Sequence, residues 1–178
     1  LKVKLSDWAI WDDTYAFIED KNEAYIKSNL VDNALKTLQI DMMIFLNLRG
    51  EVVYAMSEDP DKGVTRFLPA GFKELLIKED VLLAHADEKS SVTGMVVLLG
   101  EPLMVVSNPI VQSDGKGPRR GTMIFATYLD REELKRFGNI IGEDMDIQRM
   151  DAVSLPSDFS AAREALLQGK GTFVKILD

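Results

Sequence analysis

The segment 6–18 has the sequence SDWAIWDDTYAFI, and it indicates how the rest of the chain is arranged. Trp8, Trp11 and Tyr15 recur at spacings of three and four residues, which is the period of one face of an α-helix. Further apolar residues lie beside this stripe, so a helix here must bury most of its circumference. Two tryptophans and a tyrosine need more covering surface than a single neighbouring helix provides. We therefore expect one long amino-terminal helix, over about residues 6–20, packed on a sheet.

The two aspartates inside this segment allow two interpretations. In a continuous helix Asp12 lies one turn from both Trp8 and Tyr15, so its carboxylate is at the edge of the aromatic stripe. Either the stripe is core and Asp12 and Asp13 are solvated, or Asp12 is a polar anchor inside an aromatic-walled cavity. Residue types alone favour the first interpretation, and they do not decide the matter.

The composition is that of a soluble globular protein without cysteine. The 178 residues are 46% hydrophobic and 28% charged, which is enough for one core with room for a subdomain. The net charge of −8 argues against a nucleic-acid partner, because binding phosphates requires a basic face. The absence of cysteine excludes disulfides and thiolate metal sites.

The chain reads as a segment of a longer protein. Its longest apolar region, residues 95–111, is interrupted by Gly100-Glu101-Pro102 and cannot cross a bilayer. No signal peptide is visible, and the first residue is Leu1 rather than methionine. We expect targeting elements to lie outside these residues.

After the first helix the pattern predicts a sheet built from hairpins. Strands are expected at 40–48, 51–56, 91–99, 102–111 and 122–129, with a polar loop at 57–63 and a long glycine-rich loop at 112–121. Residues 22–30 either continue the first helix or form a second one. Further helices are expected at 31–38, 72–77 and 160–168, with another from Asp130 to Gly138 or Gly142; strands are also expected at 146–150 and 172–177. Because hairpins dominate, the predicted fold class is α+β with an antiparallel sheet.

No catalytic signature is recognisable in the chain. His85 has no second histidine or thiol near it, so a packed or solvated role is expected. Asp12 and Asp13 point apart on a helix, which is unsuited to acid–base pairing. The run 115–121 lacks the Gly-Lys-Ser/Thr ending of a phosphate loop. We predict a binding module that is not an enzyme, with no cofactor and no metal; a hydrolase using Asp12 or Asp41 with His85 is the remote alternative.

Residues 7–18 closely resemble the start of the fourth-type CHASE domain (CHASE4), an extracytoplasmic sensory module. Supporting matches are Tyr25, Asn29, Ile40-Asp41 to Arg49-Gly50, Ser107-Asn108-Pro109-Ile110, Gly117-Pro118-Arg119-Arg120-Gly121-Thr122 and Leu129-Asp130. The resemblance covers residues 7–134. One departure is Asn47, where the family usually has aspartate before the turn glycine, although either side chain suits such a turn.

The resemblance implies an α+β fold in which a long amino-terminal helix packs on an antiparallel PAS/Cache-like sheet with short connecting helices. It implies a position on the extracytoplasmic side of the cell membrane, between two transmembrane helices of a signalling receptor such as a sensor histidine kinase. We expect residues 1–178 to be a single sensory domain, with a core over 7–142 and an extension over 143–178 that stops before the second membrane helix. The expected partners are an unidentified small molecule and a second receptor copy in a homodimer.

We expect the ligand site to lie between the concave face of the sheet and the connecting loops. The candidate ligand-binding residues are Trp11, Asp12 and Tyr15 from the helix, and Tyr54, Met104, Ser107 and Asn108 from the strands. Ligand binding would shift the amino-terminal helix against the sheet, and the membrane helices would carry that shift inward. The alternative is a ligand-free structural or dimerisation module, in which the aromatic stripe is core.

Overall fold

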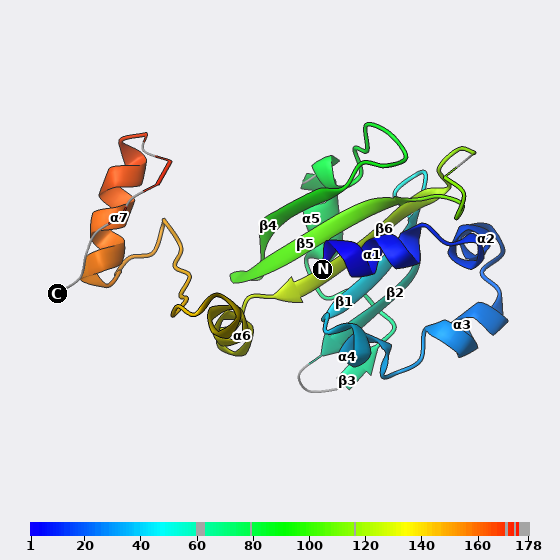
Figure 1. The fold of residues 1–178 in the computed structure, drawn as a ribbon, viewed down its shortest axis with the longest axis horizontal. Helices are drawn as coiled ribbons and strands as arrows, with labels where there is room; N and C mark the ends of the chain where they lie inside the picture. Colours follow the sequence, from blue (N-terminus) through cyan, green and yellow to red (C-terminus); the bar gives the residue numbers. More distant parts are fainter. Residues whose placement is uncertain (60–62, 79, 116, 170, 173, 175–178) are drawn as a thin grey trace. The chain divides into compact units, whose positions relative to one another are not determined.

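Residues 1–130 contain a six-stranded antiparallel sheet in the computed structural model, which describes residues 1–59, 63–78, 80–115, 117–169, 171–172 and 174 (Figure 1). Its strands are β1 Met42–Asn47, β2 Val52–Asp59, β3 Gly63–Thr65, β4 Val92–Leu98, β5 Glu101–Ile110 and β6 Gly121–Tyr128. They lie in the order β3-β2-β1-β6-β5-β4. The sheet has two halves, β3-β2-β1 and β6-β5-β4, and they are joined where β1 pairs with β6. The predicted antiparallel sheet is therefore confirmed.

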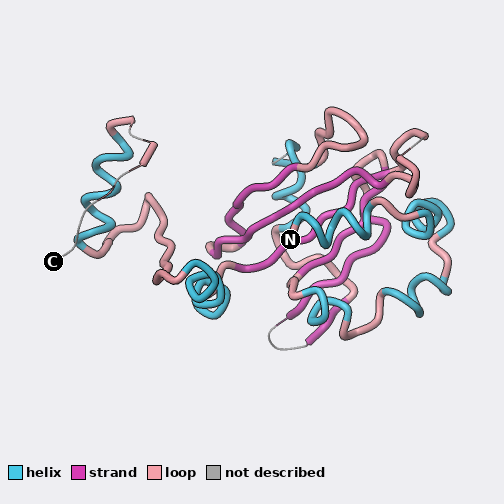
Figure 2. Tube along the Cα trace, viewed as in Figure 1, coloured by secondary structure: helices cyan, strands magenta, loops and turns pink. Residues whose placement is uncertain are grey.

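Short helices cover one face of this sheet (Figures 1 and 2). They are α1 Lys2–Ala9, α2 Asp12–Asp20, α3 Glu23–Asn29 and α4 Ala34–Leu38. The opposite face is covered by α5 Phe72–Lys78 and the 3-10 helix η1 Asp80–Leu82. Strand β1 supplies both cores, because Met43 and Phe45 face the amino-terminal helices while Ile44 and its alternate neighbours face α5. This two-sided burial explains why the strand reads as a continuous apolar run.

The prediction of one long amino-terminal helix is wrong. The chain breaks between α1 and α2, where Trp11 has an extended backbone with φ −146° and ψ 132°. At the break Ile10 forms a parallel bridge with Val111, the residue after β5. Asp12 and Asp13 then occupy the first turn of α2, where carboxylates complement the helix dipole. The two aspartates therefore begin a second helix, although the spacing of the aromatic residues indicates a single continuous one.

Smaller differences from the expected elements lie at chain segments with weak patterns. Strand β2 continues through the predicted polar loop to Asp59 and pairs with β3, which the sequence did not reveal. Residues 146–150 form no strand. The predicted strand at 172–177 falls largely outside the described residues.

The hydrogen bonds of the β1–β2 turn account for the asparagine at position 47. The Asn47 Oδ1 atom accepts hydrogen bonds from the backbone N–H groups of Arg49 and Glu51, at 2.9 and 3.0 Å. Its Nδ2 atom donates to the Glu51 Oε2 atom at 2.7 Å. An aspartate could make the first two contacts, but its carboxylate would repel Glu51 instead of donating to it. Asparagine at position 47 is thus matched to the glutamate at position 51.

The chain divides into two compact units, residues 1–130 and residues 131–178. The first holds the sheet and the helices described above. The second holds α6 Arg131–Ile141 and α7 Ser157–Leu167. The narrower core and extension expected from the sequence stay predictions. Within the described ranges, no helix combines the length and apolar character that crossing a membrane requires.

The close approach of β1 and β6 gives a stability prediction. A Cβ atom at Gly121 would lie 2.1 Å from the backbone oxygen of Leu46, so Gly121→Ala must push the central strands apart. We expect a loss of about 3 kcal/mol in the free energy of unfolding, measured by urea denaturation. Gly94→Ala in β4 is the matched control, because a Cβ atom there meets nothing within 4 Å. A Gly121→Ala variant as stable as Gly94→Ala would contradict this packing.

Candidate functional site

The break between α1 and α2 is attached to the connection between β5 and β6. The backbone N–H of Val111 donates to the carbonyl oxygen of Ala9 at 3.1 Å. Asp12 and Ser113 exchange two hydrogen bonds: the Asp12 N–H donates to Ser113 Oγ at 3.2 Å, and the Ser113 N–H donates to Asp12 Oδ1 at 3.0 Å. Asp12 is exposed, and its carboxylate ties the hairpin to the start of α2.

Tyr15 and Arg120 extend this attachment along α2. The Tyr15 hydroxyl donates to the carbonyl oxygen of Pro118 at 2.9 Å. The Arg120 guanidinium lies over the Tyr15 ring, with 3.9 Å between its carbon atom and the ring centroid, and it also donates to the Tyr15 carbonyl oxygen at 3.2 Å. The same group approaches Glu19 Oε2 at 3.2 Å. We call Asp12, Tyr15, Ser113, Pro118 and Arg120 the hairpin clamp.

Trp11 and Tyr54 belong to an aromatic cluster between the helices and the sheet. The ring centroid of Trp11 lies 6.2 Å from Trp8 and 5.8 Å from Tyr25. Tyr54 on β2 lies 6.0 Å from Phe17, and burial raises the pKa of its hydroxyl. That hydroxyl is buried without a hydrogen-bond partner in the part of the chain that the structure describes. The aromatic side chains thus fill the space between the amino-terminal helices and the sheet.

The three candidate residues on β5 do not share one face. Leu103 and Val105 face α5 and Val106 faces the amino-terminal helices, so strand alternation places Met104 and Asn108 on the helix side. Asn108 is 4% exposed, and its Nδ2 atom donates to the Ser6 hydroxyl at 2.9 Å. Ser107 faces the opposite side. The period of two in a strand should have separated Ser107 from Asn108 at the sequence level.

Ser107 lies in a second polar cluster, which sequence reasoning missed. Its hydroxyl donates to the carbonyl oxygen of Leu82 at 2.5 Å and lies 3.0 Å from His85 Nε2. The Arg119 guanidinium donates to the carbonyl oxygen of His85 at 3.4 Å. Burial, and secondarily the charge of Arg119, lowers the pKa of His85. The available signal was the adjacent pair Arg119-Arg120 before a strand, since alternation sends such neighbours to opposite faces.

The arrangement of these groups does not support the hydrolase alternative. The Ser107 proton is directed to Leu82, so the hydroxyl accepts from His85 instead of being deprotonated by it. Asp41 Oδ2 accepts from the hydroxyl of Thr127 and the N–H of Tyr128, at 2.8 and 2.7 Å. Asp12 is engaged in the hairpin clamp. The carboxylates therefore fix the backbone, and no group of three metal-ligating side chains occurs among the described residues.

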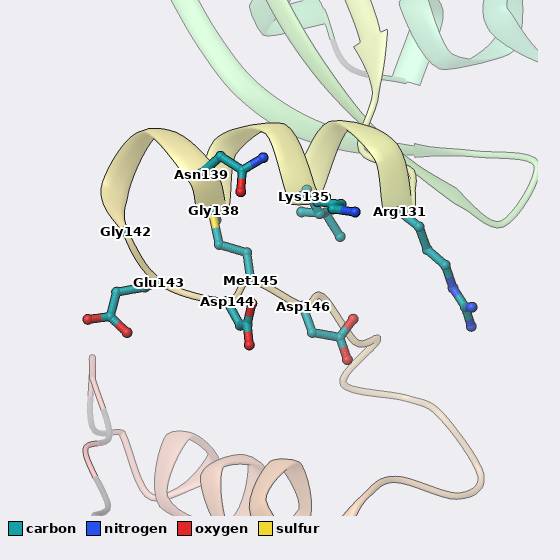
Figure 3. Close-up of a pocket in the computed structure, with 10 residues that line it drawn as sticks. Arg131, Lys135, Gly138, Asn139, Gly142, Glu143, Asp144, Met145 and Asp146 are labelled. Atoms are coloured by element: carbon teal, nitrogen blue, oxygen red, sulfur yellow. The ribbon is translucent and has the colours of Figure 1, made fainter.

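A hollow of about 600 Å³ lies in the second unit, between α6 and the segment that follows it (Figure 3). Arg131 and Lys135 border it on the helix, and Glu143 and Asp146 border it on the segment. Figure 3 shows Met145 directed toward α6 and the two carboxylates directed apart. The acidic groups therefore do not converge on a common ion position.

The CHASE4 domain family model matches residues 1–148. The chain belongs to the CHASE4 family. It is 33% identical, over 146 residues, to the methanogenesis regulatory histidine kinase FilI of Methanothrix harundinacea (strain 6Ac). That match covers 82% of this chain but 16% of the kinase, so the chain spans a small part of its relative's length. The family model and this relative together identify residues 1–148 as a CHASE4 sensory domain.

Two solved structures share the fold. The extracellular domain of the putative histidine kinase vpHK1S-Z8 has a TM-score of 0.53 at 13% identity, with 76% of this chain and 51% of that one covered. A domain of a putative sensory box/GGDEF family protein from Vibrio parahaemolyticus has a TM-score of 0.50 at 12% identity, with 72% and 52% covered. This CHASE4 domain spans about half of each, and at these identities the likeness concerns architecture alone. The expected PAS/Cache-like sheet is confirmed.

The hairpin clamp gives a second stability prediction. Arg120→Ala removes the guanidinium that stacks on Tyr15 and bonds to its backbone, so we expect a loss of about 1–2 kcal/mol in the free energy of unfolding. Hydrogen exchange of amides in residues 112–121 should become faster, because the hairpin loses its hold on α2. Arg49→Ala is the control: it removes the same charge from an exposed turn and should reduce the free energy of unfolding less than Arg120→Ala does. Equal effects of the two variants would show that Arg120 anchors nothing.

The environment of His85 gives a pH prediction. The chain has one histidine, so its imidazole resonance is assigned without ambiguity. Its pKa in the folded protein should lie below about 6.5, the ordinary value that applies when the chain is unfolded. As the pH falls below about 6.5, the unfolded chain binds a proton that the folded one refuses, so folding stability decreases down to the folded pKa. His85→Gln should remove this part of the pH dependence; an unchanged stability difference between the two proteins across the range would contradict it.

Proposed function

We propose that this chain is the extracytoplasmic ligand-sensing domain of a transmembrane receptor, which binds a small molecule and passes a displacement of its amino-terminal helices across the membrane. The observation that carries the proposal is the attachment of the α1–α2 break to the β5–β6 hairpin in a domain of the CHASE4 family. Membership of a sensor family supplies the role. The attachment supplies a route from the sheet to the helices.

The hairpin clamp is suited to this role because its contacts are individually weak. Asp12 and Ser113 are exposed, and hydrogen bonds of this type contribute about 1 kcal/mol each. A ligand that favours one hairpin position by about 1–3 kcal/mol could therefore change how α1 and α2 are held. The core beneath the clamp, with Phe17 and Phe45 fully buried, would stay intact during such a shift.

The ligand belongs on the face that carries Ser107, according to this proposal. On the helix face the Tyr25 ring contacts both Trp11 and Phe17, with ring centroids 5.8 and 4.5 Å away. On the other face, residues 83–91 between η1 and β4 form an irregular loop. Such a loop can change conformation when a ligand binds. Trp11, Tyr15, Tyr54 and Asn108 would then transmit the signal, while Ser107 would lie on the face that binds the ligand.

A panel of metabolites tests the proposal by thermal unfolding. A true ligand at about 100 times its dissociation constant adds about 2.7 kcal/mol to the free energy of unfolding. The original anchor hypothesis is tested in the same assay with Asp12→Ala, using Asp13→Ala as the control, since both aspartates are exposed and adjacent. A ligand shift that survives Asp12→Ala removes Asp12 from the ligand contacts.

Two further measurements separate sensing from the alternative of a ligand-free dimerisation module. Such a module would show no ligand shift, and its unfolding temperature would rise with protein concentration. The gene that encodes this chain should specify a hydrophobic span before Leu1 and another after Asp178. Absence of both spans would contradict the transmembrane part of the proposal.

A further inference from the structure

Arg119 stands out among the charged groups of this acidic protein. Its neighbour Arg120 approaches the carboxylate of Glu19 at 3.2 Å, whereas Arg119 makes no ion pair with any described residue. Within the described ranges, its hydrogen-bond partner is the carbonyl oxygen of His85, at 3.4 Å. The side chain is only partly exposed, so water does not fully compensate its charge. In a chain of net charge −8, this half-buried guanidinium has no carboxylate partner among the described residues.

The hydrogen bonds around His85 determine which ring nitrogen carries the proton in the neutral form and which one is protonated when the ring becomes charged. Because Ser107 donates to Leu82, its hydroxyl accepts the Nε2 proton of His85. The other ring nitrogen, Nδ1, is buried and has no partner in the described ranges. When His85 becomes an imidazolium, its new N–H is therefore at Nδ1, and it needs an acceptor.

The described charged groups around His85 provide no acceptor for this Nδ1–H group. Of the described charged groups, Arg119 is the one that acts on the ring, and it opposes protonation. The carboxylates of Asp87 and Glu88 belong to the same segment as His85, but both residues are exposed and neither contributes to its titration. An anion placed between the guanidinium and the ring would satisfy both groups at once.

We propose that Arg119 and His85 bind a small oxyanion, with Ser107 fixing the orientation of the His85 ring. This inference deepens the proposed function, on which it rests, by giving the chemical class of the sensed ligand. The planar guanidinium presents paired donors that match a carboxylate or phosphate. The imidazolium N–H at Nδ1 supplies a further charge-assisted hydrogen bond, so one proton is taken up with the oxyanion.

The position of Arg119 connects this site to the hairpin clamp. Arg119 and Arg120 are adjacent, and they reach opposite faces of the sheet: one contacts His85, the other Tyr15. An oxyanion that draws Arg119 toward His85 acts on the backbone that also carries Arg120. Because the Nδ1 atom is buried, the segment carrying His85 must yield for the oxyanion to reach it. Binding is thus linked to a rearrangement on both faces.

The single histidine allows a direct test by NMR. The pKa of His85 is measured from its imidazole resonance in sodium chloride, sodium acetate and sodium phosphate at equal ionic strength. A tenfold preference of the oxyanion for the protonated form raises the pKa by about one unit. We expect acetate, phosphate or both to raise it relative to chloride. A rise with acetate alone indicates an organic carboxylate, and a rise with phosphate alone indicates a phosphate-type ligand.

Variants identify the groups responsible. Arg119→Gln should abolish the oxyanion-dependent rise in the His85 pKa. Arg119→Lys keeps the positive charge but lacks the paired N–H donors of the guanidinium, so it should reduce the rise. Arg49→Gln removes the same charge from an exposed turn and should leave the rise intact. Far-ultraviolet circular dichroism confirms that each variant is folded; if Arg119→Gln does not fold, the Arg119→Lys comparison decides.

Failure of the oxyanion site can be distinguished from failure of the proposed sensing function. Equal His85 pKa values in all three salts would overturn the oxyanion site, as would an unchanged rise in a folded Arg119 variant. If a neutral or cationic metabolite then stabilises the domain in the thermal panel, the sensing function stands and only the ligand class was wrong. If no compound stabilises it, the sensing function fails as well.

Discussion

The structure depends on the point where Ile10 bridges to Val111. There the chain leaves α1, runs extended through Trp11 and begins α2, and the end of β5 supplies the backbone partner. A straight helix would have placed Trp8, Trp11 and Tyr15 in one row above the sheet. The break instead lets Trp8 and Trp11 meet edge to face, and it brings Tyr15 over the hairpin, where Arg120 covers it. The aromatic core and the hairpin clamp are both consequences of one extended residue.

This arrangement gives the amino-terminal helices two different kinds of support. Beneath them, Phe17 and Phe45 pack with ring centroids 5.5 Å apart, and such contacts change only if side chains repack. Beside them, the clamp combines exposed hydrogen bonds between Asp12 and Ser113 with the partly buried contacts of Tyr15 and Arg120. The exposed bonds exchange readily with water. A tightly packed aromatic core beside more easily broken clamp contacts suits a domain whose helices must move while it stays folded. Ser107 and Arg119 lie in the polar cluster on the opposite face, and Pro118 and Arg120 belong to the clamp at this edge.

The sequence predicted the parts of the fold that local patterns specify. The hairpin of β4 and β5, the central strand β1 and helix α6 follow from apolar runs, turn residues and caps, and each is present. The break at Trp11 could not be found this way, because its cause is a partner about a hundred residues later in the chain. The candidate site was predicted less well for a similar reason. Asp12 and Tyr15 contact the β5–β6 hairpin, and their role as ligand contacts stays a prediction. Strand alternation separates Ser107 from Asn108, which the sequence analysis grouped together. His85 gains Ser107 and Arg119 as neighbours only through the sheet.

The chain contains two tryptophans, and they flank the α1–α2 break with 6.2 Å between their ring centroids. Their fluorescence therefore originates entirely at the junction that would have to move during signalling. Emission wavelength and quenching in the unlabelled protein report on that one location, uncontaminated by indoles elsewhere. The same residues that hold the amino-terminal helices in place make the domain its own optical probe.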